Sequence, residues 1–260
     1  MSTVSQHTEQ NRRAWDEIAL IRQQNMHWPA AAFFAQGGSV LDARVLACAG
    51  DVAGCRLLHL QCATGEETLS WAVAGAKAVG VDISAIQIEF ARQKAVQAGL
   101  DVGFVAADIY NLPAELQDGS FEIVYTGGGA LVWLPDIVTW AQVVAHALRR
   151  GGRLILFEEH PIAGCLGVDN GRVKVMWDYF GRGTPSYDQG WGHFAGGEEA
   201  TTVKAEFSWP LGDVVTALVR AGMHIELLEE FPSEAEWRFG EALDSVCRLP
   251  GLYLLAARKH

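Results

Sequence analysis

Residues 56–67 read RLLHLQCATGEE, and residues 79–84 read VGVDIS. The first stretch is an apolar run that ends in a turn of small residues and continues into helix-forming residues, and the second is an apolar run that ends in Asp82. A strand, a tight turn, a helix and a second strand that ends in an acid make up a nucleotide-binding β-α-β unit. These residues therefore predict a parallel α/β fold with a site for an adenosine-containing cofactor.

Composition limits the class of protein. The 260 residues are half apolar, which suits one large α/β domain or one domain with an insertion. No apolar run approaches the ~20 residues that span a bilayer, and the polar start has no leader-like pattern, so we expect a cytoplasmic protein without membrane contact. The net charge of −11 disfavours nucleic acid as a partner, and five cysteines without a CxxC pair argue against both disulfides and zinc.

Short apolar runs alternate with helix-like segments from Cys55 onward. The pattern predicts strands at residues 56–60, 78–82, 103–106, 122–126, 153–158, 225–228 and 252–257. It predicts helices at residues 66–74, 85–98 and 137–149 and between Pro210 and Gly222, with Gly151-Gly152 ending the third. Strands that alternate with helices imply a parallel sheet with helices on both faces.

Two segments do not follow this alternation. Residues 1–54 are expected to form an N-terminal helical cap that precedes the main domain at residues 55–260, with Trp15, Ile18 and Ala19 on one helical face. From about residue 160 to 208 the chain is rich in aromatic residues and glycine and has no regular period. Such a long break within a compact domain predicts a substrate lid.

Further motifs stand in register with the turn and with Asp82. Asp108-Ile109 follow the third expected strand, and Thr126-Gly127 end the fourth. In this order the motifs resemble the class I S-adenosylmethionine-dependent methyltransferases, closely over residues 55–160. The Leu60-Gln61-Cys62 turn is similar to that of a bacterial small-molecule subgroup of this family. The resemblance implies a Rossmann-like sheet of seven mostly parallel strands whose last strand is antiparallel.

The resemblance also implies how the cofactor, S-adenosylmethionine, is held. The turn would pass under its methionine part, Asp82 would accept hydrogen bonds from the ribose hydroxyls, and Asp108 would meet the adenine amino group. Two isoleucines would pack on the adenine faces, and the end of the fourth strand would lie beneath the sulfonium. The residues expected to bind the cofactor are Trp15, Gln61, Cys62, Ala63, Gly65, Asp82, Ile83, Gln87, Asp108, Ile109, Thr126 and Gly127.

Three positions depart from the family's usual turn. Members usually carry an acid where His59 stands and glycines where Gln61 and Ala63 stand. We interpret the turn as a variant that keeps the close approach of the backbone and moves the side-chain contacts. Two alternatives remain open: a non-catalytic module that binds S-adenosylmethionine, and a nicotinamide-dependent oxidoreductase, which would normally need a second glycine at Ala63.

Tryptophans gather in the segments that approach the carboxyl ends of the strands, where open α/β sheets bind ligands. An aromatic cage at that edge would hold a planar methyl acceptor and favour the sulfonium charge, although each ring can also be a packing residue. The residues expected to bind the acceptor are Trp28, Trp133, His160, Trp177, Tyr179 and Trp191.

His160 follows the fifth expected strand and is the candidate general base, with the capping of a turn before Pro161 as the alternative role. No metal is expected, because Glu158 and Glu159 lack the aspartates and asparagine that would complete a metal site. The sequence thus predicts a methyltransferase, monomeric or homodimeric, that acts on a nitrogen or oxygen of a small aromatic or heteroaromatic metabolite. Secondary-metabolite or toxin biosynthesis is implied by the resemblance alone.

Overall fold

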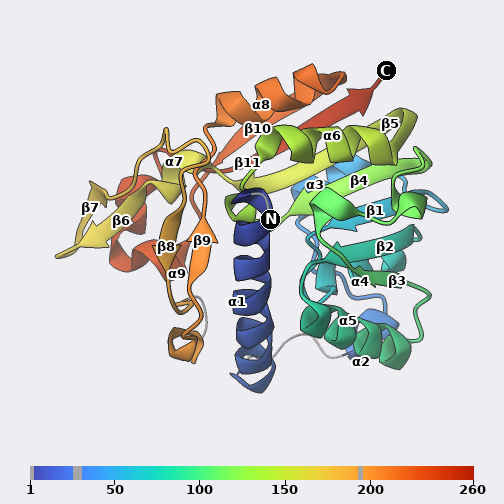
Figure 1. Cartoon of the computed structure of the whole chain (residues 1–260), viewed down its shortest axis with the longest axis horizontal. Helices are drawn as coiled ribbons and strands as arrows, with labels where there is room; N and C mark the ends of the chain where they lie inside the picture. The colour runs from blue at the N-terminus through green and yellow to red at the C-terminus, as the bar shows by residue number, and fades with distance from the viewer. Residues whose placement is uncertain (1–2, 26–30, 193–195) are drawn as a thin grey trace.

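A single mixed sheet organises the molecule, and the computed structural model describes residues 3–25, 31–192 and 196–260. The strands of this sheet are β1 (Arg56–Leu60), β2 (Lys77–Asp82), β3 (Gly103–Ala106), β4 (Phe121–Gly127), β5 (Leu148–Glu159), β10 (Met223–Pro232) and β11 (Pro250–Lys259). They lie in the order β10-β11-β5-β4-β1-β2-β3 (Figure 1). The expected strands are therefore all present, several of them longer than the sequence indicated.

The direction of the strands confirms the predicted fold class. β1 pairs in parallel with both β2 and β4, and the parallel arrangement continues to β3 and β5. β11, the last strand, is antiparallel to both of its neighbours, β5 and β10. This is a Rossmann-like sheet in which the carboxyl ends of β1, β2, β3 and β4 share one edge.

Helices cover both faces of the sheet because the apolar strands bury alternate residues on opposite sides. On one face lie α3 (Ala43–Ala49), α4 (Glu66–Val73) and α5 (Ala85–Ala98), and on the other lie α6 (Ile137–Ala147) and α8 (Leu211–Arg220). In β1, for example, Leu57 packs with Trp71 of α4, whereas Leu58 belongs to the cluster that contains Trp140 of α6. Hydrophobic packing on both faces fixes the register of the sheet.

The N-terminal segment begins with α1 (Thr3–Asn25), followed after the undescribed residues 26–30 by α2 (Ala31–Ala35). α1 contacts α5 on one side, and on the other it contacts β9 (Lys204–Glu206) and the short helix η4 (Gly197–Glu199) (Figure 1). Ala14, Ile18 and Ala19 of α1 are buried. α1 therefore joins the sheet domain to the segment that follows β5.

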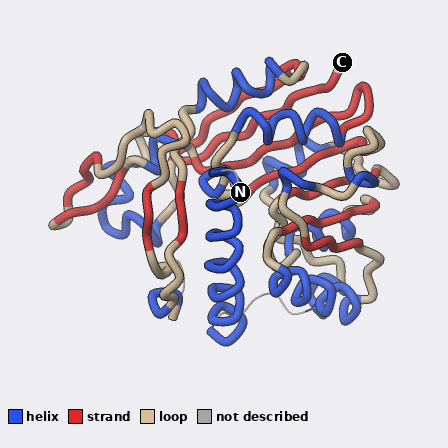
Figure 2. Tube along the Cα trace, viewed as in Figure 1, coloured by secondary structure: helices blue, strands red, loops and turns tan. Residues whose placement is uncertain are grey.

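That segment forms a separate group of small elements (Figure 2). It contains α7 (Pro161–Gly164), the hairpin of β6 (Leu166–Asp169) and β7 (Arg172–Val175), and the pair of β8 (Ser186–Asp188) and β9. The connection from β10 to β11 adds α9 (Glu236–Phe239) and α10 (Leu243–Val246), which bury Phe239 and Val246 against Leu166. The lid predicted at residues 160–208 thus packs on a second segment that the sequence did not indicate.

One predicted boundary was wrong. Gly151 and Gly152 do not end a helix, because α6 ends at Ala147 and β5 begins at Leu148. The two glycines lie inside β5 at a bulge, where Gly151 has φ +74° and a Cβ on Gly152 would lie 2.9 Å from the carbonyl oxygen of Phe121. Glycine is required there by backbone approach. Within the described residues, no helix has the length and apolarity needed to cross a membrane.

Candidate functional site

The turn after β1 keeps the backbone path of a glycine-rich loop although most of its glycines are replaced. Gln61 has φ +58° and Ala63 has φ +47°, and both values lie in the left-handed region that glycine favours. Gly65 follows with φ +86°, and a Cβ there would lie 2.8 Å from Ala91 of α5 and from Phe104 of β3. Gly65 is therefore the position where packing demands glycine, while the other two positions carry side chains at the cost of backbone strain.

Gln61 ties this turn to the segment after β4. Its Nε2 donates a hydrogen bond of 2.8 Å to the carbonyl oxygen of Ala130. Because a carbonyl can only accept, this bond fixes the orientation of the amide, and Oε1 is left buried without a protein partner. Gln61 lines the cavity described below, so a ligand donor at this wall is one group that could satisfy Oε1.

Asp82 ends β2 and is held by backbone groups on both sides. Its Oδ2 accepts from the backbone N–H of Ala63 and its Oδ1 from that of Ser84, each at 2.9 Å. Burial raises the pKa of Asp82 to about 6, with the nearby Asp16 contributing in the same direction. Gln87 Nε2 also donates to Oδ1, at 3.4 Å. If each carboxylate oxygen accepts two bonds, Oδ2 keeps capacity for one ligand hydroxyl, and a second hydroxyl would have to replace the long bond from Gln87.

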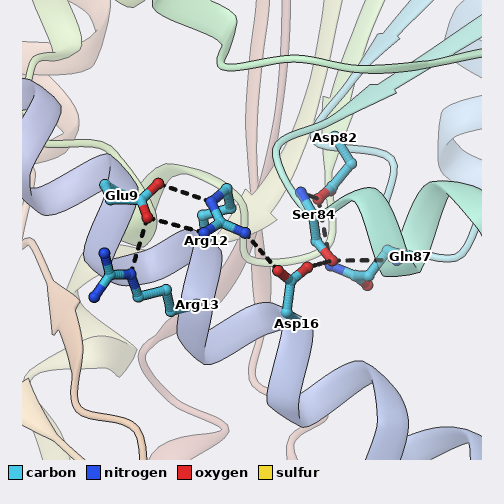
Figure 3. A network of polar contacts seen from close by, with 7 residues as sticks. All are labelled: Glu9, Arg12, Arg13, Asp16, Asp82, Ser84 and Gln87. Atoms are coloured by element: carbon cyan, nitrogen blue, oxygen red, sulfur yellow. Dashed lines mark hydrogen bonds and ion pairs between the residues drawn. The ribbon is translucent and has the colours of Figure 1, made fainter.

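A polar network extends from Asp82 to the N-terminal helix (Figure 3). Ser84 caps α5 by accepting from the N–H of Gln87, and it donates to Asp16 of α1 at 2.6 Å. Asp16 in turn accepts from Arg12 at 2.6 Å. The helix that carries Trp15 is thereby anchored beside the carboxylate that ends β2.

One cavity of about 410 Å³ opens at the carboxyl ends of β1, β2, β3 and β4 and is covered by α1. Ten of the residues predicted to bind cofactor line it. They are Trp15, Gln61, Cys62, Ala63, Asp82, Ile83, Gln87, Asp108, Ile109 and Gly127. Gly65 and Thr126 lie outside the lining, the first because it packs against α5 and β3 and the second because its side chain is fully buried in β4.

Three tryptophans meet at the wall of the cavity. Trp15 comes from α1, Trp133 from the short helix η3 (Leu131–Trp133), and Trp191 from the segment after β8. Their ring centroids lie 5.0 to 5.3 Å apart, in tilted or edge-on arrangements. Asn11 supports the cluster by donating to the carbonyl oxygens of Ala205 and Trp133. The predicted acceptor residues Trp133 and Trp191 are thus brought together, with Trp15 added.

Other predicted acceptor residues lie elsewhere. His160 is buried away from the cavity lining, where its Nδ1 accepts from the N–H of Ile162 and its Nε2 lies 2.9 Å from Glu230. Its observed role is to cap α7, the alternative that the sequence left open. Trp177 is half exposed, and Tyr179 accepts from the N–H of Leu211; neither lines the cavity. Trp28 lies outside the described residues.

Buried acids near β1 and β4 were not predicted as site residues. Glu67, in the first turn of α4, lines the cavity, and burial raises its pKa to about 7. Glu158 of β5 accepts from the N–H of Ala130 at 2.7 Å, and burial raises its pKa to about 8. Glu158 thereby holds the β4 to η3 connection that forms one cavity wall.

The sequence contained a signal for part of what was missed. Thr8, Asn11, Trp15 and Arg22 all line the cavity, and their spacing of three, four and seven residues places them on one face of α1. Tyr110 also lines the cavity, and no sequence signal indicated this. Its position depends on a distant residue, because its hydroxyl donates to the carbonyl oxygen of Asp136 and accepts from the N–H of Asp136.

Comparison with known proteins identifies the part of the chain that builds this site. Residues 57–152 match a family model described as a methyltransferase domain. This part of the chain is similar to a methyltransferase domain. A solved S-adenosylmethionine-dependent methyltransferase from Mesorhizobium loti has the same fold with a TM-score of 0.64, at 26% identity over 83% of this chain and 96% of that one. The match covers most of both chains, so this chain shares the fold of that enzyme.

Curated relatives are similar to this chain over about half of its length. The ubiquinone biosynthesis O-methyltransferase of Bordetella parapertussis is 33% identical over 54% of this chain and 57% of its own length. The 27-O-demethylrifamycin SV methyltransferase of Amycolatopsis mediterranei is 38% identical over 48% of this chain and 46% of its own length. The chain thus spans about half the length of the curated relatives that it matches.

The residues present fit S-adenosylmethionine. The cavity offers a carboxylate at the end of β2, a second one at Asp108 beside Ile109, and an unpaired acceptor at Gln61. Gly127 also lines the cavity, and packing requires glycine there, because a Cβ would lie 2.5 Å from the Tyr125 hydroxyl. Acidic and acceptor groups suit a cofactor that carries a sulfonium and an ammonium group.

Proposed function

We propose that the protein transfers a methyl group from S-adenosylmethionine to an oxygen or nitrogen of a small planar aromatic metabolite. The observation that carries this proposal is a single cavity that joins the loop and acids of the methyltransferase domain to a cluster of three tryptophans. The cofactor and the methyl acceptor would then be bound side by side in one cavity. This continuity is what a one-step group transfer requires.

The strand order suggests how the cofactor lies. Adenine would rest between Ile83 and Ile109 with its amino group at Asp108, and the ribose hydroxyls would donate to Asp82 at the end of β2. The methionine part would then extend over the Gln61–Gly65 turn toward β4. S-adenosylmethionine, when bound, supplies a methyl group on a positively charged sulfur.

The acceptor would occupy the tryptophan side. Flat indole surfaces hold planar rings and exclude water, and they favour a nearby positive charge. In the transfer, the acceptor oxygen forms a bond to the methyl carbon while the carbon–sulfur bond breaks and its electron pair stays on sulfur. The hydroxyl proton is released to the solvent outside the reacting centre. The protein's part is to align the two reactants and keep bulk water out.

The names of the relatives favour oxygen as the acceptor atom. Both curated relatives described above are O-methyltransferases by name or by the demethylated substrate that they are named for. Each match covers about half of this chain. The relatives therefore support small-molecule methyl transfer, and the acceptor's shape must come from the tryptophan cluster.

The proposal is tested by binding and turnover together. Isothermal titration with S-adenosylhomocysteine should show one site, and Asp82→Ala should weaken it roughly 5- to 100-fold, because the ribose hydroxyls lose their acceptor. Transfer of labelled methyl to a panel of hydroxylated bicyclic aromatics should then depend on Trp133. A protein that binds the cofactor product but methylates no member would instead be a non-catalytic binding module, and one that binds neither would refute the proposal.

A further inference from the structure

Glu67 occupies an unusual place for a carboxylate. It lies in the first turn of α4, and its Oε1 accepts a hydrogen bond of 3.0 Å from the hydroxyl of Tyr125 in β4. Its Oε2 lies 3.7 Å from Nε2 of His59 in β1. The side chain is 30% exposed, and it forms part of the cavity wall.

The neighbours of Glu67 do not balance its charge. Burial lowers the pKa of His59 to about 3, so this ring is neutral at physiological pH and the contact is not an ion pair. Tyr125 is an uncharged donor, and the nearby Glu66 is an acid that adds to the cost of ionising Glu67. Glu66 itself is neutralised by Lys94. A buried carboxylate without a counter-ion is unfavourable unless a ligand supplies the charge.

The strands that Glu67 contacts indicate which part of the bound cofactor lies next to it. Its contacts are with β1 and β4, which are adjacent in the sheet, whereas Asp82 ends β2 on the far side of β1. Glu67 also lies close to the backbone after β4, since its Oε2 is 4.0 Å from the place of a Cβ on Gly128. With the ribose at Asp82, the β1 and β4 side receives the amino-acid end of the cofactor.

We propose that Glu67 binds the α-ammonium group at the amino-acid end of S-adenosylmethionine. The inference rests on the proposed function and deepens it. The unpaired Oε1 of Gln61 supplies a second acceptor in the same wall, and an ammonium group has three donors to share between them. Arg22 of α1 is the one lysine or arginine among the described residues that line the cavity. Its positive charge suits the carboxylate at the amino-acid end of the cofactor.

The test compares two ligands that differ only at the amino-acid end. S-adenosylhomocysteine carries the ammonium and carboxylate groups, and 5′-methylthioadenosine lacks both. By isothermal titration, Glu67→Gln should weaken S-adenosylhomocysteine roughly 10- to 100-fold, as expected for the loss of a charged hydrogen bond, and leave 5′-methylthioadenosine unchanged. The substitution keeps the shape of the side chain and its acceptor for Tyr125.

Glu89→Gln is the matched control, because Glu89 lies on the exposed face of α5 and should change neither affinity. Equal weakening of both ligands by Glu67→Gln would show a structural role for Glu67 and overturn the inference. Unchanged affinity for S-adenosylhomocysteine would overturn it as well. If the unsubstituted protein binds neither ligand, the cofactor assignment itself fails, and this outcome is distinct from the other two.

Discussion

At the scale of single residues, Gln61 and Ala63 adopt a backbone conformation that costs an L-residue roughly 1 to 2 kcal/mol. In Ala63 the side chain gains no hydrogen bond in return. In Gln61 it bridges the cavity floor to Ala130, so part of the strain is offset. Ala63 therefore shows the cost of the backbone conformation alone, and Gln61 shows the same cost together with a side-chain hydrogen bond.

This difference yields a prediction for the turn. Gln61→Gly should weaken S-adenosylhomocysteine about 3- to 10-fold, because the loop loses its hydrogen bond to Ala130. Ala63→Gly is the control: it relaxes the same kind of backbone without removing a polar contact, and its affinity should stay within twofold of the unsubstituted protein. Titration calorimetry measures both, and equal affinities for the two variants would show that the Gln61 side chain is only tolerated.

At the scale of elements, α1 is held between two partners that lie far apart in the sequence. Asp16 connects it to the N-terminus of α5 through Ser84, and Asn11 connects it to Ala205 of β9. The cavity-lining face of α1 is thereby positioned from both sides. α1 is 23 residues long, and buried Ala14, Ile18 and Ala19 add apolar contacts to this placement. Further hydrogen bonds, from Gln10 to Val203 and from Thr201 and Thr202 to Glu17, hold its outer side.

Asp16→Ala tests this anchoring. It removes the acceptor of Ser84 while the capping bond from Gln87 to Ser84 remains, so α5 should stay intact. We expect faster amide hydrogen exchange in α1 and a several-fold weaker affinity for S-adenosylhomocysteine. Arg13→Ala removes only an exposed contact with Glu9 and should leave both quantities unchanged. Exchange in α1 that is as slow as in the unsubstituted protein would contradict the proposed anchoring.

The sequence could predict those elements whose signal is local. The period of apolar residues located the strands and α5 because each strand buries both faces against helices, and Asp82 and Asp108 could be placed because a strand end determines their position. It failed for His160 and Tyr179, where aromatic composition does not reveal whether a ring faces a cavity or caps a turn. It also missed Glu67, whose meaning depends on Tyr125 and His59 from two other strands.

At the scale of the whole molecule, buried carboxyls make stability depend on pH. Burial raises the pKa of Glu67 to about 7 and that of Glu158 to about 8, whereas both groups titrate near 4.5 without it. Between these values the folded state keeps protons that the unfolded chain has released, so the free energy of unfolding falls as pH rises. His59 does not oppose this trend above about pH 6.5, where it is neutral in both states.

We therefore expect the cofactor-free protein to lose roughly 2 kcal/mol of stability between pH 6.5 and 8.5. Urea unfolding at several pH values measures the loss. Glu158→Gln, which cannot ionise but can still accept from Ala130, should flatten the decline. Stability that is constant or rises over this range, or a variant with an unaltered slope, would show that Glu158 is not protonated in the folded state.

The meeting of Trp15, Trp133 and Trp191 has a practical consequence for experiments. Three of the chain's nine indoles come from three separate segments and lie 5.0 to 5.3 Å apart. Their share of the ultraviolet emission reports on how those segments sit together, and a Trp133→Phe variant identifies that share. An acceptor that enters the cavity must touch or displace at least one of them. The intrinsic emission of the unlabelled protein is thus a direct way to screen compound libraries for acceptors before any product has been detected.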